Sequence, residues 1–314
     1  MLPGEQRLQR LGYSVETARP ATSGVRFPDG GAWRVEIPSV EGPQPLEAVL
    51  DEAARLDVPL HRVSQGSGVM MLSDGDVKDM VSLAASRNAE LSLFLGPRGT
   101  WDVGTAARST SGGSGPRARG TDQLGQCVED ALRAAELGVR NVLVADEGVL
   151  WACHRLRLEG TLPADFRFKV SVLTGPVNPA AFAVWAGLGA DSINVPSDLT
   201  VAQVAELRAT SPAALDFYLE TPDDAGGIVR LYDGAELIRV GAPIYLKFGL
   251  RNAPGIYPVG QHLRDVAVAS GRERVRRARL ALDLLDRAGG AELPMSPLGD
   301  PTLPRPPRFA APNE

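Results

Sequence analysis

Side chains that bind metals or form disulfides are scarce in this chain of 314 residues. Its 2 cysteines, Cys127 and Cys153, are too few for a disulfide framework or for a four-cysteine zinc or iron–sulfur site. It has 3 histidines, so a histidine-rich zinc or iron site is not expected either. The composition therefore indicates no transition-metal cofactor.

Long apolar runs and a strong net charge are absent as well. No run approaches the roughly 18 consecutive apolar residues that a membrane-spanning helix needs, and residues 1–7 lack the basic-then-apolar order of a secretory signal. We therefore expect a cytoplasmic protein with no membrane partner. The net charge of −5 gives no electrostatic support for nucleic-acid binding. A small molecule is the expected partner, and a homodimer is compatible with the same composition.

Lysine is rare, since only 3 of the 33 basic residues are lysine and the rest are arginine. Such lopsided use of arginine, together with abundant alanine and glycine, is typical of a GC-rich bacterial genome. Two of the three lysines, Lys169 and Lys247, lie inside predicted strands, where a buried ammonium group needs a partner or a ligand. Their side chains therefore become candidates for function.

What the chain does have is a regular alternation of strand and helix patterns. Eight short segments alternate apolar and polar residues with the period of two that a β-strand requires. Helical patterns separate them, which predicts parallel strands joined by right-handed crossovers. The predicted strands are Trp33–Pro38, Leu60–Ser64, Leu91–Gly96, Asn141–Glu147, Phe168–Leu173, Ser192–Pro196, Leu215–Glu220 and Ile244–Gly249.

Eight such units predict a single (β/α)8 barrel, a TIM barrel, over residues 31–290. We expect residues 1–30 to form an N-terminal extension and residues 291–314 to form an extended, proline-rich tail. A doubly wound open sheet is the alternative fold. Its buried strands should be apolar on both faces, whereas several strands here are polar on one face, which favours the barrel.

The polar faces of the last two strands carry chemically capable side chains. Segment 215–220 places Glu220 on its polar face, and segment 244–249 does the same for Lys247. Because the eighth strand of a barrel lies between the seventh and the first, Lys247 should be flanked by Glu220 and Glu36. An ammonium between two carboxylates would bind an anion or transfer protons. If one carboxylate were engaged elsewhere, the lysine could react as an amine with a carbonyl group.

We therefore expect Lys247, Glu220 and Glu36 to be the catalytic residues. The alternative interpretation is an interior ion-pair network that holds the strands in register and does no chemistry.

Substrate-binding side chains are expected around this lysine. Guanidinium groups bind carboxylates and phosphates through paired hydrogen bonds, so arginines near strand ends indicate an anionic substrate. Asn194 would orient a substrate oxygen, while Lys169 lies near a strand start, where a stabilising role is also expected. The expected substrate-binding residues are Arg62, Arg98, Glu147, Lys169, Asn194, Tyr218 and Arg251.

Two loops and one helix complete these expectations. The loop 97–122 is rich in glycine, serine and arginine, which predicts a mobile lid over the catalytic end, with disorder as the alternative. After the seventh strand, Asp223 and Asp224 could bind Mg²⁺ together with Glu220, although acidic helix starts explain them equally well. The arginines of the helical stretch 272–287 are interpreted as a solvent-facing surface.

Three short motifs lie in the second half of the chain. They read Asn-Pro-Ala-Ala-Phe at 178–182, Leu-Gly-Ala-Asp-Ser-Ile-Asn-Val at 188–195 and Asp-Leu-Thr at 198–200. Over roughly residues 140–220 the chain thereby resembles the collagenase-like peptidases of unassigned catalytic type, and segment 227–251 is similar to a bacterial subgroup of that family. The resemblance implies a barrel fold and a peptidase or amide hydrolase activity. The chain lacks the cysteine cluster that many members of the family carry.

From the residues we expect an enzyme that acts on a small anionic carbonyl metabolite, carboxylated or phosphorylated, by Lys/Glu acid–base or lyase-type chemistry. A lyase or isomerase is favoured over a hydrolase, because no Ser–His–Asp or Cys–His arrangement is evident. Two alternatives stay open. A collagenase-like peptidase would need a groove open to a peptide, and a non-catalytic ligand-binding barrel would have fully paired interior groups with no cavity above them.

Overall fold

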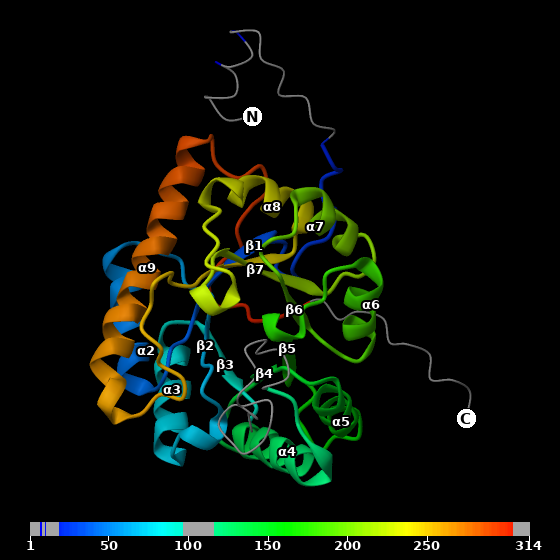
Figure 1. Cartoon of the computed structure of the whole chain (residues 1–314), viewed down its shortest axis with the longest axis vertical. Coiled ribbons are helices and arrows are strands. Elements are labelled where there is room, and N and C mark those ends of the chain that lie inside the picture. The colour runs from blue at the N-terminus through cyan, green and yellow to red at the C-terminus, as the bar shows by residue number, and fades with distance from the viewer. Residues whose placement is uncertain (1–6, 8–9, 11–18, 97–115, 304–314) are drawn as a thin grey trace, which may run out of the picture.

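The chain folds as a closed barrel of eight parallel strands with helices arranged around it (Figure 1). The computed structural model describes residues 7, 10, 19–96 and 116–303. The strands follow one another around the barrel in chain order, and β1 (Trp33–Pro38) pairs with β8 (Ile244–Phe248) to close it. The predicted (β/α)8 barrel is confirmed, and the open doubly wound sheet is excluded.

The strands show the alternation that the sequence predicts. The apolar half of β1, Val35 and Ile37, is fully buried in the core between barrel and helices, and the polar half points into the barrel. The remaining strands are β2 Arg62–Ser64, β3 Glu90–Phe94, β4 Asn141–Val144, β5 Arg167–Val170, β6 Ser192–Val195 and β7 Ala214–Glu220.

The helices that follow the strands are α2 Pro43–Arg55, α3 Asp74–Ser86, α4 Gly120–Glu136, α5 Glu147–Leu158, α6 Pro179–Gly187, α7 Val201–Arg208, α8 Gly234–Gly241 and α9 Arg264–Arg287. Their starts follow capping signals in the sequence. Ser73 and Asp76 form a reciprocal capping box at α3, and Thr200 and Gln203 do the same at α7. Of the helices among the described residues, none is both long and apolar enough to cross a membrane.

Helix α9 packs closely along α2, and the two lie side by side in Figure 1. Every third or fourth residue of α9 is buried, including Gly271 and Arg274. A methyl group at Gly271 would lie 2.8 Å from Cγ2 of Val49 on α2, closer than real side-chain contacts, so the glycine permits this approach. The burial of Arg274 shows that the interpretation of 272–287 as a purely solvent-facing surface is wrong.

Segments near both ends of the chain cover the N-terminal face of the barrel. The backbone N–H of Ser23 donates to the Arg239 carbonyl at 2.8 Å, and Phe27 packs edge-on against Tyr245. From the other end, the N–H of Ser296 donates to the Trp33 carbonyl at 3.0 Å. These contacts fasten both segments to the barrel at the end opposite the carboxyl ends of the strands.

His61 is held in its neutral form at this face. It is 6% exposed, its Nδ1 accepts from the N–H of Val35 at 3.1 Å, and its Nε2 donates to the Ser296 carbonyl at 2.9 Å. A protonated ring could not accept the bond from Val35. Burial accordingly lowers the pKa of His61 to about 4.

We expect the free energy of unfolding to fall by about 3 kcal/mol through this histidine as the pH drops from about 6.5 to about 4. In that range the unfolded chain binds a proton at His61 and the folded chain does not. Above it neither state binds the proton, and below it both do. Urea denaturation of the wild type and of His61→Gln at several pH values measures the effect, since glutamine keeps a donor and an acceptor without titrating.

His262→Gln, at an exposed histidine, serves as the matched control and should keep the wild-type pH dependence. If His61→Gln shows the same loss of stability with acid as the wild type, the assigned role of His61 is incorrect.

Candidate functional site

The lowest layer of the barrel interior is a paired and electrically balanced network. Arg34 Nη1 donates to Tyr245 Oη at 2.9 Å, and Tyr245 Oη donates to Glu90 Oε2 at 3.0 Å. Arg167 Nη1 lies 3.0 Å from Glu90 Oε1, and Arg34 Nη2 lies 2.8 Å from Asp29 Oδ2. Two guanidinium groups therefore meet two carboxylates, and this layer has no charge left for a ligand.

A second layer, above the first, holds charged side chains from β1, β2, β5 and β7. Arg62 is fully buried; its Nε donates to Glu36 Oε2 at 2.7 Å and its Nη2 donates to Asp216 Oδ1. Lys169 Nζ donates to Glu36 Oε1 and lies 3.7 Å from Asp216 Oδ2. These bonds cross the barrel between four strands, so this part of the interior acts as a structural ion-pair network.

Lys247 lies at the top of this second layer. Its Nζ is 3.5 Å from Glu36 Oε1 and 4.1 Å from the centre of the Tyr218 ring. Asn194 completes its surroundings, because its amide oxygen accepts from Lys247 Nζ at 2.6 Å and its amide nitrogen donates to the Asp216 carbonyl at 3.0 Å. The predicted neighbourhood of Lys247 and Glu36 is confirmed by the pairing of β1 with β8.

The second layer contains one more cation than it has carboxylates. Arg62, Lys169 and Lys247 face Glu36 and Asp216. Arg62 Nη1 also lies 3.8 Å from Glu90 Oε2 of the layer below, but Glu90 is already paired there with Arg167. Burial alone would raise the pKa of Glu36, but the three cations together hold it well below its ordinary value. Burial lowers the pKa of Lys169, and the neighbouring cations add to the shift while Glu36 opposes it. The excess charge favours a bound anion or the loss of a proton from a lysine.

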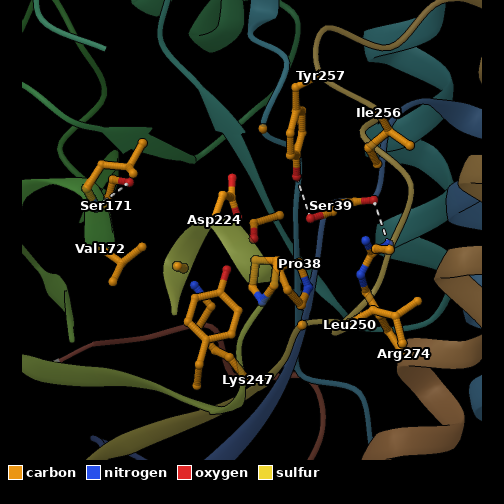
Figure 2. A pocket seen from close by; sticks show the side chains of 18 of the residues that line it. Pro38, Ser39, Ser171, Val172, Asp224, Lys247, Leu250, Ile256, Tyr257 and Arg274 are labelled. Atoms are coloured by element: carbon orange, nitrogen blue, oxygen red, sulfur yellow. Dashed lines mark hydrogen bonds between the residues drawn. The ribbon is translucent and has the colours of Figure 1, made fainter. Parts of the chain in front are cut away.

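A cavity of about 370 Å³ lies above Lys247 at the carboxyl ends of the strands (Figure 2). Its walls are largely apolar, and the loop between β8 and α9 lines it with residues 253–257. Few polar groups on mostly apolar walls are the usual construction of a small-molecule site, and this end of the barrel is where barrel enzymes act. The volume suits a small metabolite better than a stretch of peptide.

The predicted contact between Glu220 and Lys247 is wrong. A register shift between Tyr218 and Glu220 pairs Tyr218 with Lys247 and turns Glu220 away from it. Oε1 of Glu220 accepts from the backbone N–H of Arg251 at 3.0 Å, and Oε2 lies 3.6 Å from Nε of Arg277 on α9. Glu220 therefore fastens the end of β7 to the following loop and to α9.

Four of the predicted substrate-binding residues lie in the barrel interior. Asn194 and Tyr218 line the cavity beside Lys247. Arg62 and Lys169 lie beneath it, and the carboxylates of the second layer already occupy their donors. A ligand in the cavity would therefore contact the first two residues and not the last two.

Two others lie outside the cavity. Glu147 does not end a strand but begins α5, because Asp146 caps that helix, and its exposed carboxylate pairs with Arg117. Arg251 is 56% exposed at the rim, and its Nε lies 3.7 Å from Asp223. Arg98 and residues 97–115 of the predicted lid lie outside the described residues, and the remainder of that segment already enters α4 at Gly120.

The acidic residues near β7 do not converge. Asp223 Oδ2 accepts the N–H of Asn252 at 2.5 Å, while Glu220 faces α9. Across residues 19–96 and 116–303, no group of three or more histidine, cysteine, aspartate or glutamate side chains is placed to hold a metal ion. The arrangement suggested for Mg²⁺ is therefore not formed by these three carboxylates.

Helix α9 contributes one cavity residue that the sequence analysis missed. Arg274 is 4% exposed and lines the cavity beside Ser39, which follows β1 (Figure 2). The signal lay in the helical period, because Arg274 stands on the buried stripe between Gly271 and Ala278. A charged side chain on the otherwise apolar, buried face of a helix indicates a candidate for function as well as for packing.

Comparisons with known proteins extend only to the fold. No protein-family model matches the chain, and no curated protein matches its sequence. One similar solved structure is a protein of Streptococcus agalactiae assigned as the copper homeostasis protein CutC, with 14% identity, a TM-score of 0.45, and a match that covers 68% of this chain and 98% of that one. A U32 peptidase has 17% identity and a TM-score of 0.43, and the match covers 78% of this chain and 100% of the peptidase. A truncated 3-deoxy-D-arabino-heptulosonate 7-phosphate synthase from Thermotoga maritima has 12% identity and a TM-score of 0.43, with 83% of this chain and 89% of that one covered.

With TM-scores below 0.5, these likenesses carry no argument about activity. No family model supports the resemblance to the collagenase-like peptidases. The function has to be argued from the cavity and its side chains.

Proposed function

We propose that this protein is an enzyme that acts on a small anionic carbonyl compound, with the amino group of Lys247 as the reacting group. The observation that carries the proposal is the position of this lysine on the floor of the barrel-end cavity, within the layer that has an excess positive charge. An anion would balance that charge, and a carbonyl group is the natural reaction partner of an amine.

Two forms of lyase- or isomerase-type chemistry fit these residues. In the first, Nζ of Lys247 attacks the carbonyl carbon, a C–N bond forms, and the carbonyl oxygen leaves as water. An ammonium and a carbonyl give a protonated Schiff base and water with no net change in protons, and the ionised Glu36, 3.5 Å away, holds the amino group in position. In the second form, the neutral amine removes a proton from the carbon beside the carbonyl and returns it to another position.

A hydrolase is less well supported by the described residues. The thiols of Cys127 and Cys153 do not line the cavity, and burial raises the pKa of both to about 12, which suppresses the thiolate that a cysteine nucleophile needs. His61 lies at the opposite end of the barrel. A purely binding barrel is likewise disfavoured by the cavity above an incompletely balanced layer.

Borohydride trapping tests the proposal directly. Pyruvate, glyoxylate and glyceraldehyde 3-phosphate are incubated with the protein and reduced, and peptide masses locate any adduct. Because the chain has only three lysines, Lys78, Lys169 and Lys247, the assignment is unambiguous. We expect added mass at Lys247, or, for the proton-transfer form, incorporation of solvent deuterium beside the probe's carbonyl without an adduct. Neither adduct nor exchange with any of these probes would contradict the proposal.

A further inference from the structure

Arg274 reaches the cavity as a buried cation without a carboxylate partner among the described residues. It is 4% exposed, its Nε has no hydrogen-bond partner, and its Nη1 has only a long contact, 3.5 Å, with the Ser39 carbonyl. Figure 2 shows it next to Ser39 and Leu250, on the side of the cavity across from Ser171 and Val172. Burying an unpaired charge is costly, so such a group is expected to meet an opposite charge in the working protein.

None of the described polar groups near Arg274 forms an ion pair with it. The hydroxyl of Ser39 accepts from Tyr257 Oη and is neutral. Glu41 also follows β1, but its carboxylate accepts two backbone N–H groups, from Gly66 at 2.7 Å and Ser67 at 3.0 Å. Of the two lining carboxylates, Asp223 is held by the N–H of Asn252 at 2.5 Å, in the turn after β7. The other, Asp224, lies between Ser171 and Tyr257 in Figure 2, apart from Arg274. The open volume of the cavity is what remains in front of the guanidinium.

We propose that Arg274 binds the acidic group of the substrate, a carboxylate or a phosphate, while Lys247 meets its carbonyl group. The inference rests on the proposed function and adds a second point of recognition to it. A guanidinium group offers parallel N–H donors to two oxygens of one anion, and the unpartnered Nε is one such donor. The substrate class is therefore a compound with a carbonyl and an acid group that are held by two different elements, β8 and α9.

Anion binding tests this assignment without any turnover. Calorimetric titration with oxalate and with inorganic phosphate compares the wild type with Arg274→Met, which keeps the length of the stem and removes the charge. We expect binding of the preferred anion to weaken by about tenfold to hundredfold. Arg274→Lys should recover part of the affinity, because it restores the charge without the paired donors. If the wild type binds oxalate more tightly than phosphate, the site is specific for a carboxylate, and the reverse order indicates a phosphate site.

Arg276→Met is the matched control, because Arg276 lies on the same helix, is exposed, and pairs with Glu273 outside the cavity. It should bind both anions as the wild type does. Thermal unfolding of the ligand-free variants provides a second readout. Removing an uncompensated buried charge should leave the midpoint of Arg274→Met unchanged or raise it, whereas a large drop would show that Arg274 is structural and overturn the inference.

Trapping at Lys247 separates this inference from the proposed function. Glyoxylate carries a carboxylate beside its carbonyl and glycolaldehyde does not, so Arg274→Met should trap less glyoxylate and as much glycolaldehyde as the wild type. Equal glyoxylate trapping in both proteins overturns the inference and leaves the proposed function standing. Anion binding that is lost in Arg274→Met, with no carbonyl trapped and no deuterium incorporated into pyruvate by any of the proteins, supports the anion site and rejects the lysine chemistry. A wild type that binds neither anion overturns the inference.

Discussion

Lys247→Met should abolish both borohydride trapping and solvent exchange while the barrel stays folded. Methionine keeps the length and packing of the stem and removes only the amino group. The fold should survive because Glu36 remains bonded to Arg62 and Lys169, and the second layer becomes electrically balanced when the extra cation is gone. Peptide mass mapping after reduction measures the loss of the adduct, and a urea denaturation curve measures whether the fold is retained.

Lys78→Met is the matched control, because Lys78 is an exposed lysine on α3 far from the second layer in the fold. The amount of adduct trapped at Lys247 in this variant should equal the amount in the wild type. A folded Lys247→Met protein that still exchanges deuterium into the probe at the wild-type rate would reduce Lys247 to a structural residue.

Arg62→Met should destabilise the protein by about 3–5 kcal/mol, the cost of removing one partner from a buried ion pair. The guanidinium of Arg62 bonds Glu36 and Asp216 and stacks 3.5 Å from the centre of the Tyr245 ring, and none of these groups has access to solvent. Without it, Asp216 keeps only the 3.7 Å ion-pair contact with Lys169, whose amino group it shares with Glu36. Chemical denaturation at pH 7 measures the loss.

The pH dependence identifies the cause of this loss. Arg62 and its neighbours hold the pKa of Glu36 well below its ordinary value in the wild type, so lowering the pH from 7 to 5 leaves that carboxylate ionised. In the variant, protonation of the stranded carboxylates relieves their burial, so the gap in stability between the two proteins should narrow at pH 5. Arg55→Met, at an exposed pair with Glu52, should leave stability essentially unchanged at both pH values. A gap that stays constant or widens on acidification would assign the loss to packing instead.

The barrel and much of its interior could be predicted because the period of two is a local property of each strand. Glu36 and Lys247 meet because the eighth strand of a barrel always neighbours the first, so the topology alone brings them together. The inward direction of Asn194 and Tyr218 followed from the same rule. Their functional roles are not given by the period, which says where a side chain points and nothing about what it binds.

The displacement of Glu220 depends on a contact between two distant segments. The N–H of Gly249 donates to the Glu220 carbonyl at 2.7 Å, and a Cβ at that glycine would lie 2.7 Å from the same oxygen. This close approach of two backbones accompanies the register shift at the end of β7. Alternation within one segment carries no information about such a neighbour. The pattern therefore wrongly placed the Glu220 side chain inside the barrel beside Lys247.

Arg274 was missed for a different reason. The search for inward-facing groups followed the strands, whereas this side chain comes from an outer helix and reaches the cavity past the end of β1. Its place on the buried stripe of α9 was readable from the sequence, but thirty arginines in the chain made a single one inconspicuous. Periodicity applied to charged as well as apolar residues would have singled it out.

Because α9 packs closely on α2 at Gly271, the cavity should select its substrates by their length. Arg274 lies one helical turn beyond that contact, and Lys247 belongs to a strand hydrogen-bonded on both sides, so neither end of the span is free to adjust. A homologous series of oxo acids, lengthened one methylene at a time, would then bind best at a single chain length. Metabolites of similar chemistry would then be distinguished by whether their length matches the fixed separation of Lys247 and Arg274, which the packing of α9 on α2 sets.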